Sequence, residues 1–81
     1  MYYIPICINY QGMQLKGYAY PVKVFEDHLP SSFSIYIQGW CIGVLSYKNG
    51  RWVMDKSIDP KFIQALGNFL YDYMHSANKF V

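Results

Sequence analysis

The chain has 81 residues, of which 53% are hydrophobic, 20% aromatic and only 15% charged, with a net charge of +2 at pH 7. This length suits one domain with a small core, and the apolar content excludes a disordered chain, which lacks the apolar area that offsets the entropy of folding. We expect a single domain over residues 1–81, with too little charge for a nucleic-acid-binding signature.

Membrane insertion and export are not expected. No apolar run reaches the roughly 18 to 20 residues of a membrane helix. The start MYYIPICINY has no basic residue ahead of its apolar stretch, as a secretory signal would. We therefore expect a cytoplasmic protein that does not bind a membrane, with Cys7 and Cys41 reduced and half-buried, because thiols in that compartment stay reduced; a disulfide is the alternative.

The first predicted element is a strand over residues 2–10, because its hydrophobic side chains alternate with a period of two. A two-residue hairpin loop at residues 11–12 would place Ile4 opposite Ala19 and keep one face of the hairpin apolar along its length. This register predicts an amphipathic hairpin with one face in the core.

The other face of this hairpin carries Pro5 and several tyrosines. Pro5 falls where its missing N–H would point away from the second strand, so we expect the first strand to be a sheet edge. Tyr3, Tyr18 and Tyr20 would lie close together on this face, next to Lys16. Two interpretations stay open: cross-strand packing that stabilises the hairpin, and a contact patch for a partner, since tyrosine is enriched in interfaces.

The second strand is expected to bend near its end. After Pro21 the apolar positions shift to Val22 and Val24, which predicts a bend or bulge. Residues 25–32, FEDHLPSS, are mostly polar and contain a proline, so they are predicted to form a loop, with a third strand starting at Phe33.

A fourth strand is predicted from about Trp40 to Tyr47, with apolar residues on both faces, as in an interior strand. Its register contains a conflict. A two-residue loop at residues 38–39 places the even-numbered residues on the core face, whereas the following hairpin places the odd-numbered ones there. Either Gly43 marks a bulge or the loop is one residue longer, and the sequence leaves both open.

The Asn-Gly pair at residues 49–50 predicts a type I′ hairpin, because that turn needs a positive φ at both central residues. Tyr47 then lies opposite Trp52 on the apolar face, and Lys48 opposite Arg51 on the other. We interpret this tip as a solvated turn that keeps the hairpin from pairing with another sheet, with a phosphate-binding tip as the alternative.

A C-terminal helix is predicted to begin at Asp59 and Pro60, a side-chain acceptor followed by a residue that needs no donor, and to end near Ser76. Its polar residues fall on one arc and its apolar residues on the opposite one. The apolar arc consists of Phe62, Ile63, Leu66, Phe69, Leu70, Tyr73, Met74 and Ala77.

Gly67 borders the apolar arc of this helix. Glycine costs about 1 kcal/mol relative to alanine in a helix interior, so its presence indicates a close approach by another element. We expect that element to be the inner face of the first hairpin at Gly17 and Ala19. Together the elements predict an α+β fold: a curved antiparallel sheet of about five strands, a meander of hairpins, packed on one amphipathic helix.

Candidate chemistry is sparse. The two histidines, His28 and His75, suggest no metal set: Asp72, three residues before His75, is expected to form only a weak pair on the helix surface. The carboxylates form no spaced pair on a predicted face. Cys41 lies in an apolar strand and is expected to be a buried core residue rather than a nucleophile. We therefore expect no enzymatic activity, no metal and no cofactor.

The leading hypothesis is a non-enzymatic binding or oligomerisation module that contacts a protein partner or a second copy through Tyr3, Tyr18, Tyr20 and Lys16. A homodimer is expected, because a chain this small cannot cover all its apolar groups with one helix. The alternative is single-stranded nucleic-acid binding, in which the tyrosines stack on bases while Lys16 and Lys23 follow the phosphates. A small ligand-binding or enzymatic pocket between sheet and helix is the third hypothesis.

Overall fold

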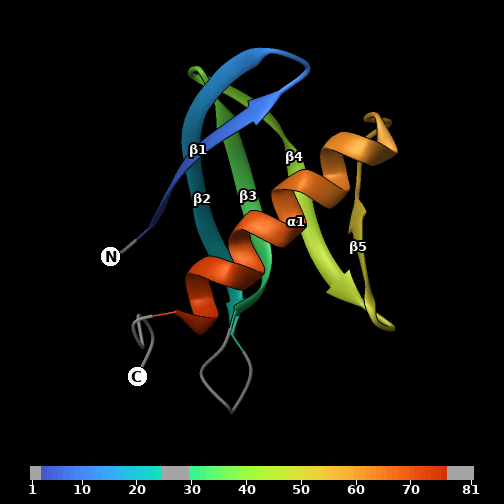
Figure 1. Ribbon diagram of the computed structural model, residues 1–81. Coiled ribbons are helices and arrows are strands. Elements are labelled where there is room, and N and C mark those ends of the chain that lie inside the picture. Colours follow the sequence, from blue (N-terminus) through green and yellow to red (C-terminus); the bar gives the residue numbers. More distant parts are fainter. Residues whose placement is uncertain (1–2, 25–29, 77–81) are drawn as a thin grey trace.

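The computed structural model describes residues 3–24 and 30–76. In these residues the order of elements is β1 (Ile4–Tyr10), β2 (Met13–Val24), β3 (Pro30–Ile37), β4 (Trp40–Lys48), β5 (Arg51–Met54) and α1 (Pro60–His75). The strands form one antiparallel sheet in the order β1-β2-β3-β4-β5, curled around α1 (Figure 1). The predicted α+β fold is confirmed, and β1 is a sheet edge as Pro5 indicated.

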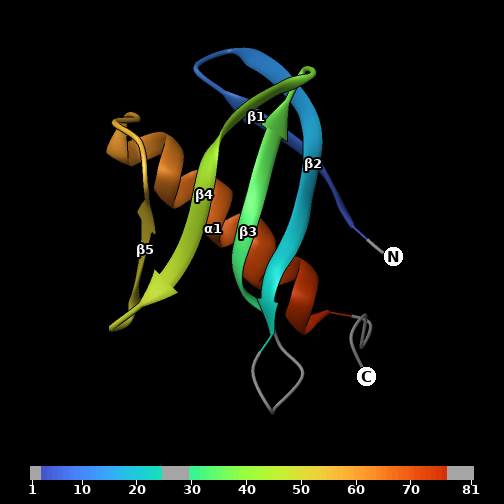
Figure 2. The same ribbon diagram turned by 180° about the vertical axis from the view of Figure 1, so that it is seen from behind.

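The core lies between α1 and the inner, concave face of the sheet. The buried hydrophobic side chains are Ile4, Ile6, Ala19, Phe33, Ile35, Leu45, Trp52, Phe62, Leu66, Leu70 and Met74. The helix contributes its predicted apolar arc, although Ala77 lies outside the described residues. Figure 2 shows the opposite side of the sheet, which α1 does not cover and which we call the outer face. Within the described residues, no helix is long and apolar enough to span a membrane.

Three hairpins with two-residue loops set the register of the sheet. Both residues of each loop have a positive φ, as type I′ turns require: Gln11 51° and Gly12 78°, Gln38 51° and Gly39 87°, Asn49 52° and Gly50 79°. The predicted registers of the first and last hairpins are confirmed. The predicted irregularity after Pro21 is confirmed too, since the pairing of β2 with β3 shifts between Pro21 and Lys23.

A bulge at Gly43 resolves the conflict in β4. Ile35 lies opposite Gly43 whereas Tyr36 lies opposite Cys41, so Ile42 is the extra residue. Gly43 has a φ of 134°, a conformation that side chains rarely allow. Of the two alternatives left open by the sequence, the bulge is therefore the one observed. Because of it, the core-facing positions of β4 change from even-numbered to odd-numbered residues.

The third strand begins at Pro30, three residues before the predicted start at Phe33. That prediction was wrong because it took the polar residues 30–32 for a loop, whereas backbone pairing does not depend on side-chain polarity. Ser32 lies opposite Ser46, and the Oγ of Ser32 donates a hydrogen bond to the Oγ of Ser46 over 2.9 Å. The rest of the predicted loop lies outside the described residues.

The two cysteines are exposed free thiols, so the prediction of buried or half-buried thiols was wrong. Cys7 alternates with the buried Ile6 and therefore points to the outer face. Cys41 precedes the bulge and lies opposite Tyr36, which also places it on the outer face. Because the residues around Cys41 are apolar on both faces of the strand, the sequence did not show which of them face the core. The bulge decides this, and it leaves Cys41 exposed.

The close approach predicted at Gly67 is observed, but its partner is Trp52 of β5 and not Gly17 or Ala19. A Cβ atom on Gly67 would lie 2.2 Å from Cδ1 and 2.4 Å from Cγ of the Trp52 indole. Trp52 is only 8% exposed, so its ring has no free space to move into. The missing side chain at Gly67 thus lets α1 settle on the short edge strand β5.

Gly67→Ala should lower the stability of the chain, although alanine is the better helix former. The gain in helix propensity is about 1 kcal/mol, whereas overpacking a full core costs about 1 to 3 kcal/mol. Urea unfolding followed by circular dichroism should show a lower midpoint for Gly67→Ala and a change of less than about 0.5 kcal/mol for the neighbouring exposed Asn68→Ala. A higher midpoint for Gly67→Ala would contradict the packing of Trp52 on this glycine.

Asp59 connects the start of α1 to the end of β1. Its Oδ1 accepts a hydrogen bond from the Lys61 backbone N–H over 3.1 Å, as the predicted N-cap, and its Oδ2 accepts one from the Tyr10 hydroxyl. The bond from Tyr10, followed by that from Lys61, lowers the pKa of Asp59. The same bond to Asp59 raises the pKa of Tyr10, whose ring packs 5.1 Å from that of Phe62.

Tyr10→Phe should reveal this contact through the pH dependence of stability, because it removes the hydroxyl and keeps the ring. Asp59 has a lowered pKa in the folded chain, so its contribution is complete above its ordinary pKa of 3.8 and is lost as pH falls through the folded value. Tyr10 has a raised pKa, so its contribution is complete below 10.0 and is lost as pH rises through the folded value.

The difference in free energy of unfolding between wild type and Tyr10→Phe should therefore be constant from about pH 5 to 9 and shrink on either side. Urea unfolding curves recorded at a series of pH values measure it. A difference of the same size at about pH 3 and at neutral pH would be inconsistent with the Tyr10–Asp59 hydrogen bond.

Candidate binding surface

Four tyrosines meet on the outer face of the sheet, three from the strands β2 and β3 and one, Tyr3, from the residue just before β1. Tyr3, Tyr18 and Tyr20, which the sequence placed together, do lie side by side, and Tyr36 of β3 joins them. Tyr18, Tyr20 and Tyr36 each alternate along their strand with a core residue, and Tyr18 lies directly opposite Tyr36. We call these four residues the tyrosine surface. Its role as a contact patch stays a prediction.

The rings of the tyrosine surface support one another. Tyr3 meets Tyr18 edge to face at 4.9 Å, and Tyr20 meets Tyr36 in the same way at 5.5 Å. Tyr3 also lies 5.7 Å from Tyr20. Edge-to-face pairs are each worth about 0.5 to 1.5 kcal/mol beyond their buried area. The rings are thus held in position without a partner, while Tyr3 and Tyr18 remain 47% and 45% exposed.

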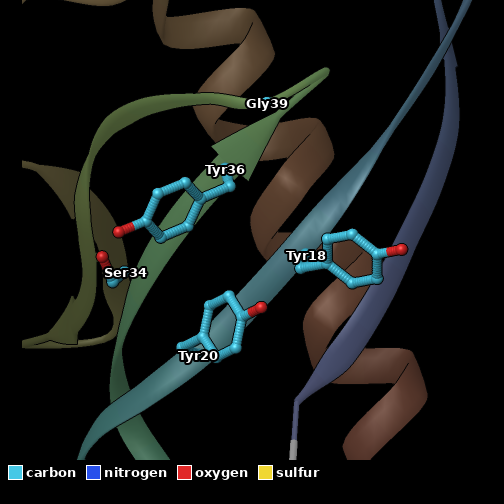
Figure 3. Close-up of a pocket in the computed structure, with 5 residues that line it drawn as sticks. All are labelled: Tyr18, Tyr20, Ser34, Tyr36 and Gly39. Carbon is cyan, nitrogen blue, oxygen red and sulfur yellow. The ribbon is translucent and has the colours of Figure 1, made fainter.

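An open depression of about 370 Å³ lies among these rings, lined by Tyr18, Tyr20, Ser34, Tyr36 and Gly39 (Figure 3). Figure 3 shows the Tyr20 hydroxyl directed toward Tyr18, and the Tyr36 hydroxyl directed away from both. Among the described residues, no protein group forms a hydrogen bond with the hydroxyls of Tyr18, Tyr20 or Tyr36. These hydroxyls can therefore bond to a ligand.

A second depression, of about 380 Å³, adjoins the first and shares Tyr18 and Gly39 with it. Its lining consists of Pro5, Ile6, Cys7, Lys16, Gly17, Tyr18, Gln38 and Gly39. Lys16 is exposed and is the one cation that lines either depression in the described chain. The two depressions form a continuous strip across β1, β2 and β3, from an aromatic part to a part with a positive charge.

Close contact between β2 and β3 shapes the floor of this strip. A Cβ atom on Gly17 would lie 1.8 Å from the carbonyl oxygen of Tyr36 and 2.9 Å from the Cα of Ile37, so only glycine fits there. Next to it, the backbone N–H of Gln38 donates to the carbonyl of Lys16 over 2.8 Å. Gly17 was predicted as a neighbour of the helix, but its close contact is with the next strand.

The other predicted site residues lie away from this strip. Lys48 and Arg51 face each other at the exposed tip of the β4–β5 hairpin, as predicted, and line neither depression. Their role at the tip stays a prediction. The side chain of Lys23 lies outside the described residues. Asp55, at the end of β5, has its Oδ1 bonded to the backbone N–H of Val44 over 2.8 Å.

Sequence reasoning missed Tyr36, although a signal for it was present. Phe33, Ile35 and Ile37 alternate toward the core, which places Tyr36 on the outer face. The register between β2 and β3, which places Tyr36 beside the other tyrosines, could not be predicted because it depends on the irregularity after Pro21. In the described part of the chain, no group of three or more His, Cys, Asp or Glu side chains is placed to hold a metal ion.

Comparison of the chain with protein-family models, with curated proteins and with solved structures finds no match. A function can therefore be inferred only from the fold and from the geometry of the tyrosine surface.

Gly17→Ala should destabilise the chain, because the added Cβ would collide with backbone atoms of β3 that cannot rotate away. We expect a loss of about 1 to 3 kcal/mol, and a change below about 0.5 kcal/mol for the adjacent exposed Lys16→Ala. Thermal unfolding followed by circular dichroism measures both. Equal melting temperatures for wild type and Gly17→Ala would contradict the close contact between β2 and β3.

Proposed function

We propose that this chain is a non-enzymatic binding module and that the tyrosine surface is its contact site. The observation that carries the proposal is the group of ordered, partly exposed tyrosine rings around an open depression. Tyrosine offers a large contact area and a hydroxyl at low entropic cost, which explains its enrichment in binding surfaces. Cross-strand packing accounts for the ring contacts, but not for a depression edged by unbonded hydroxyls.

The position of the surface also favours binding. The core lies on the other face of the sheet, so the four rings are not needed to cover it. A partner seated on the outer face would displace water from apolar rings without disturbing α1. A contiguous aromatic patch of this kind on a small chain is typical of an interaction site.

The residues around the two depressions support a binding role rather than catalysis. Among the described residues that line them, none is a His, Asp or Glu, the usual general acids and bases. Cys7, which lines the second depression, accepts a hydrogen bond from Gln14 Nε2 over 3.5 Å. A nucleophile with a base and an orienting group does not assemble there in the described chain.

Panning of a random peptide library displayed on phage tests this proposal, with the immobilised chain as bait. The double variant Tyr18→Ser, Tyr20→Ser removes two rings of the surface, and Tyr71→Ser is the matched control, because Tyr71 is 50% exposed on the polar side of α1. We expect peptides that wild type and Tyr71→Ser retain at least about tenfold better than the double variant does. Circular dichroism confirms that all three chains are folded.

A second copy of the chain is tested as partner with the same variants. If the partner is a second copy, sedimentation velocity would show a wild-type dimer that becomes a monomer in the double variant, and this outcome would also support the tyrosine surface as the contact. Peptides retained equally by wild type and the double variant, or a monomeric wild type that enriches no peptide, would overturn the proposal.

A further inference from the structure

The strip formed by the two depressions is narrow, and its width limits the size of the partner that can bind there. Neighbouring strands lie about 4.8 Å apart, so the three strands beneath the strip span only about 10 Å. A stable interface between two folded proteins buries about 800 Å² on each, which is about one seventh of the 5589 Å² surface of the chain. A strip about 10 Å wide would have to be about 80 Å long to supply that area, whereas the longest extent of the chain is 35 Å, so we take a single extended peptide as the ligand that suits it.

The charge around the strip favours a peptide over a nucleic acid as the ligand. Binding of single strands needs several cations along the backbone path. Only Lys16 lines the strip among the described residues, since Lys48 and Arg51 lie at the far tip of the β4–β5 hairpin. One cation suits a mostly uncharged ligand that carries a carboxylate at one end.

The side chains of the strip indicate which kind of peptide would fit it. Tyr20 and Tyr36 meet at 89°, so the rings stand as ridges with gaps between them rather than forming one flat stack. Flat aliphatic rings fit between such ridges, and prolines present them in a polyproline II helix. The free tyrosine hydroxyls can donate to the carbonyls of that helix, which has no internal hydrogen bonds.

We propose that the tyrosine surface binds a proline-rich segment in the polyproline II conformation, with an acidic residue of that segment next to Lys16. Aromatic grooves recognise such segments because the ligand is already extended and loses little entropy on binding. The first depression, among Tyr18, Tyr20 and Tyr36, holds proline rings, and the second holds the acidic end. This inference rests on the proposed binding function of the same surface.

Fluorescence anisotropy with labelled probes and the full chain tests the inference. The probes are decaproline, decaproline followed by two glutamates, a glycine-serine peptide of the same length with the same two glutamates, and deca-thymidylate. We expect the acidic proline peptide to bind at least about tenfold more tightly than the glycine-serine peptide. Plain decaproline should lie between them.

Single-residue variants test whether the proline peptides bind at the tyrosine surface. Tyr18→Ala should weaken decaproline binding about tenfold, and Tyr71→Ala should leave it unchanged. Tyr36→Phe, which keeps the ring, should weaken it severalfold through loss of the hydroxyl alone. Lys16→Ala should abolish the preference for the glutamate tail and leave plain decaproline within about twofold of wild type.

Four results would overturn the inference. Equal affinity for the proline and glycine-serine peptides would exclude polyproline recognition. Tighter binding of deca-thymidylate, lost in Tyr18→Ala, would assign the surface to nucleic acid, and a wild-type dimer held by the same rings would assign it to a second copy. Phage peptides that depend on Tyr18 and Tyr20 but contain no proline would leave the proposed binding function in place while refuting this ligand.

Discussion

A single helix covers one face of a five-stranded sheet, and most other features of this chain follow from that constraint. All core side chains must lie on the concave face, so the strands alternate between α1 and solvent except at the irregularities in β2 and β4. Where turn geometry and alternation disagree, the backbone adjusts, as at the Gly43 bulge. Large residues that do not fit beneath the helix are left on the convex face, and the tyrosine surface is the clearest result.

Curvature explains why the two faces of the sheet differ in packing. On the concave face, side chains converge, and Trp52 fills the space over Gly67 completely. On the convex face, side chains diverge, so neighbouring tyrosines touch mainly at their edges and open depressions remain between them. The close contact of β2 and β3 at Gly17 lies beneath this region. The same curvature that closes the core therefore opens the candidate site.

Local signals in the sequence were sufficient for most of the fold. The Asn49-Gly50 turn, the Asp59-Pro60 helix start and the register of the first hairpin each depend on a few adjacent residues. Two of the wrong predictions depend on residues far apart in the chain, whereas the start of β3 was missed because polar residues were taken for a loop. Trp52 as the partner of Gly67 and the exposure of Cys41 require the positions of distant strands, which no local pattern encodes.

The candidate site was predictable only in part, for the same reason. Tyr3, Tyr18 and Tyr20 belong to one hairpin, so turn chemistry alone placed them together. Tyr36 and the depression need the register of β2 with β3, which passes through an irregularity. Because the site lies on the face opposite the core, its rings can be exchanged at little cost to the helix packing. Stability and the proposed binding are thus assigned to different faces of the same strands, and substitutions can test them separately.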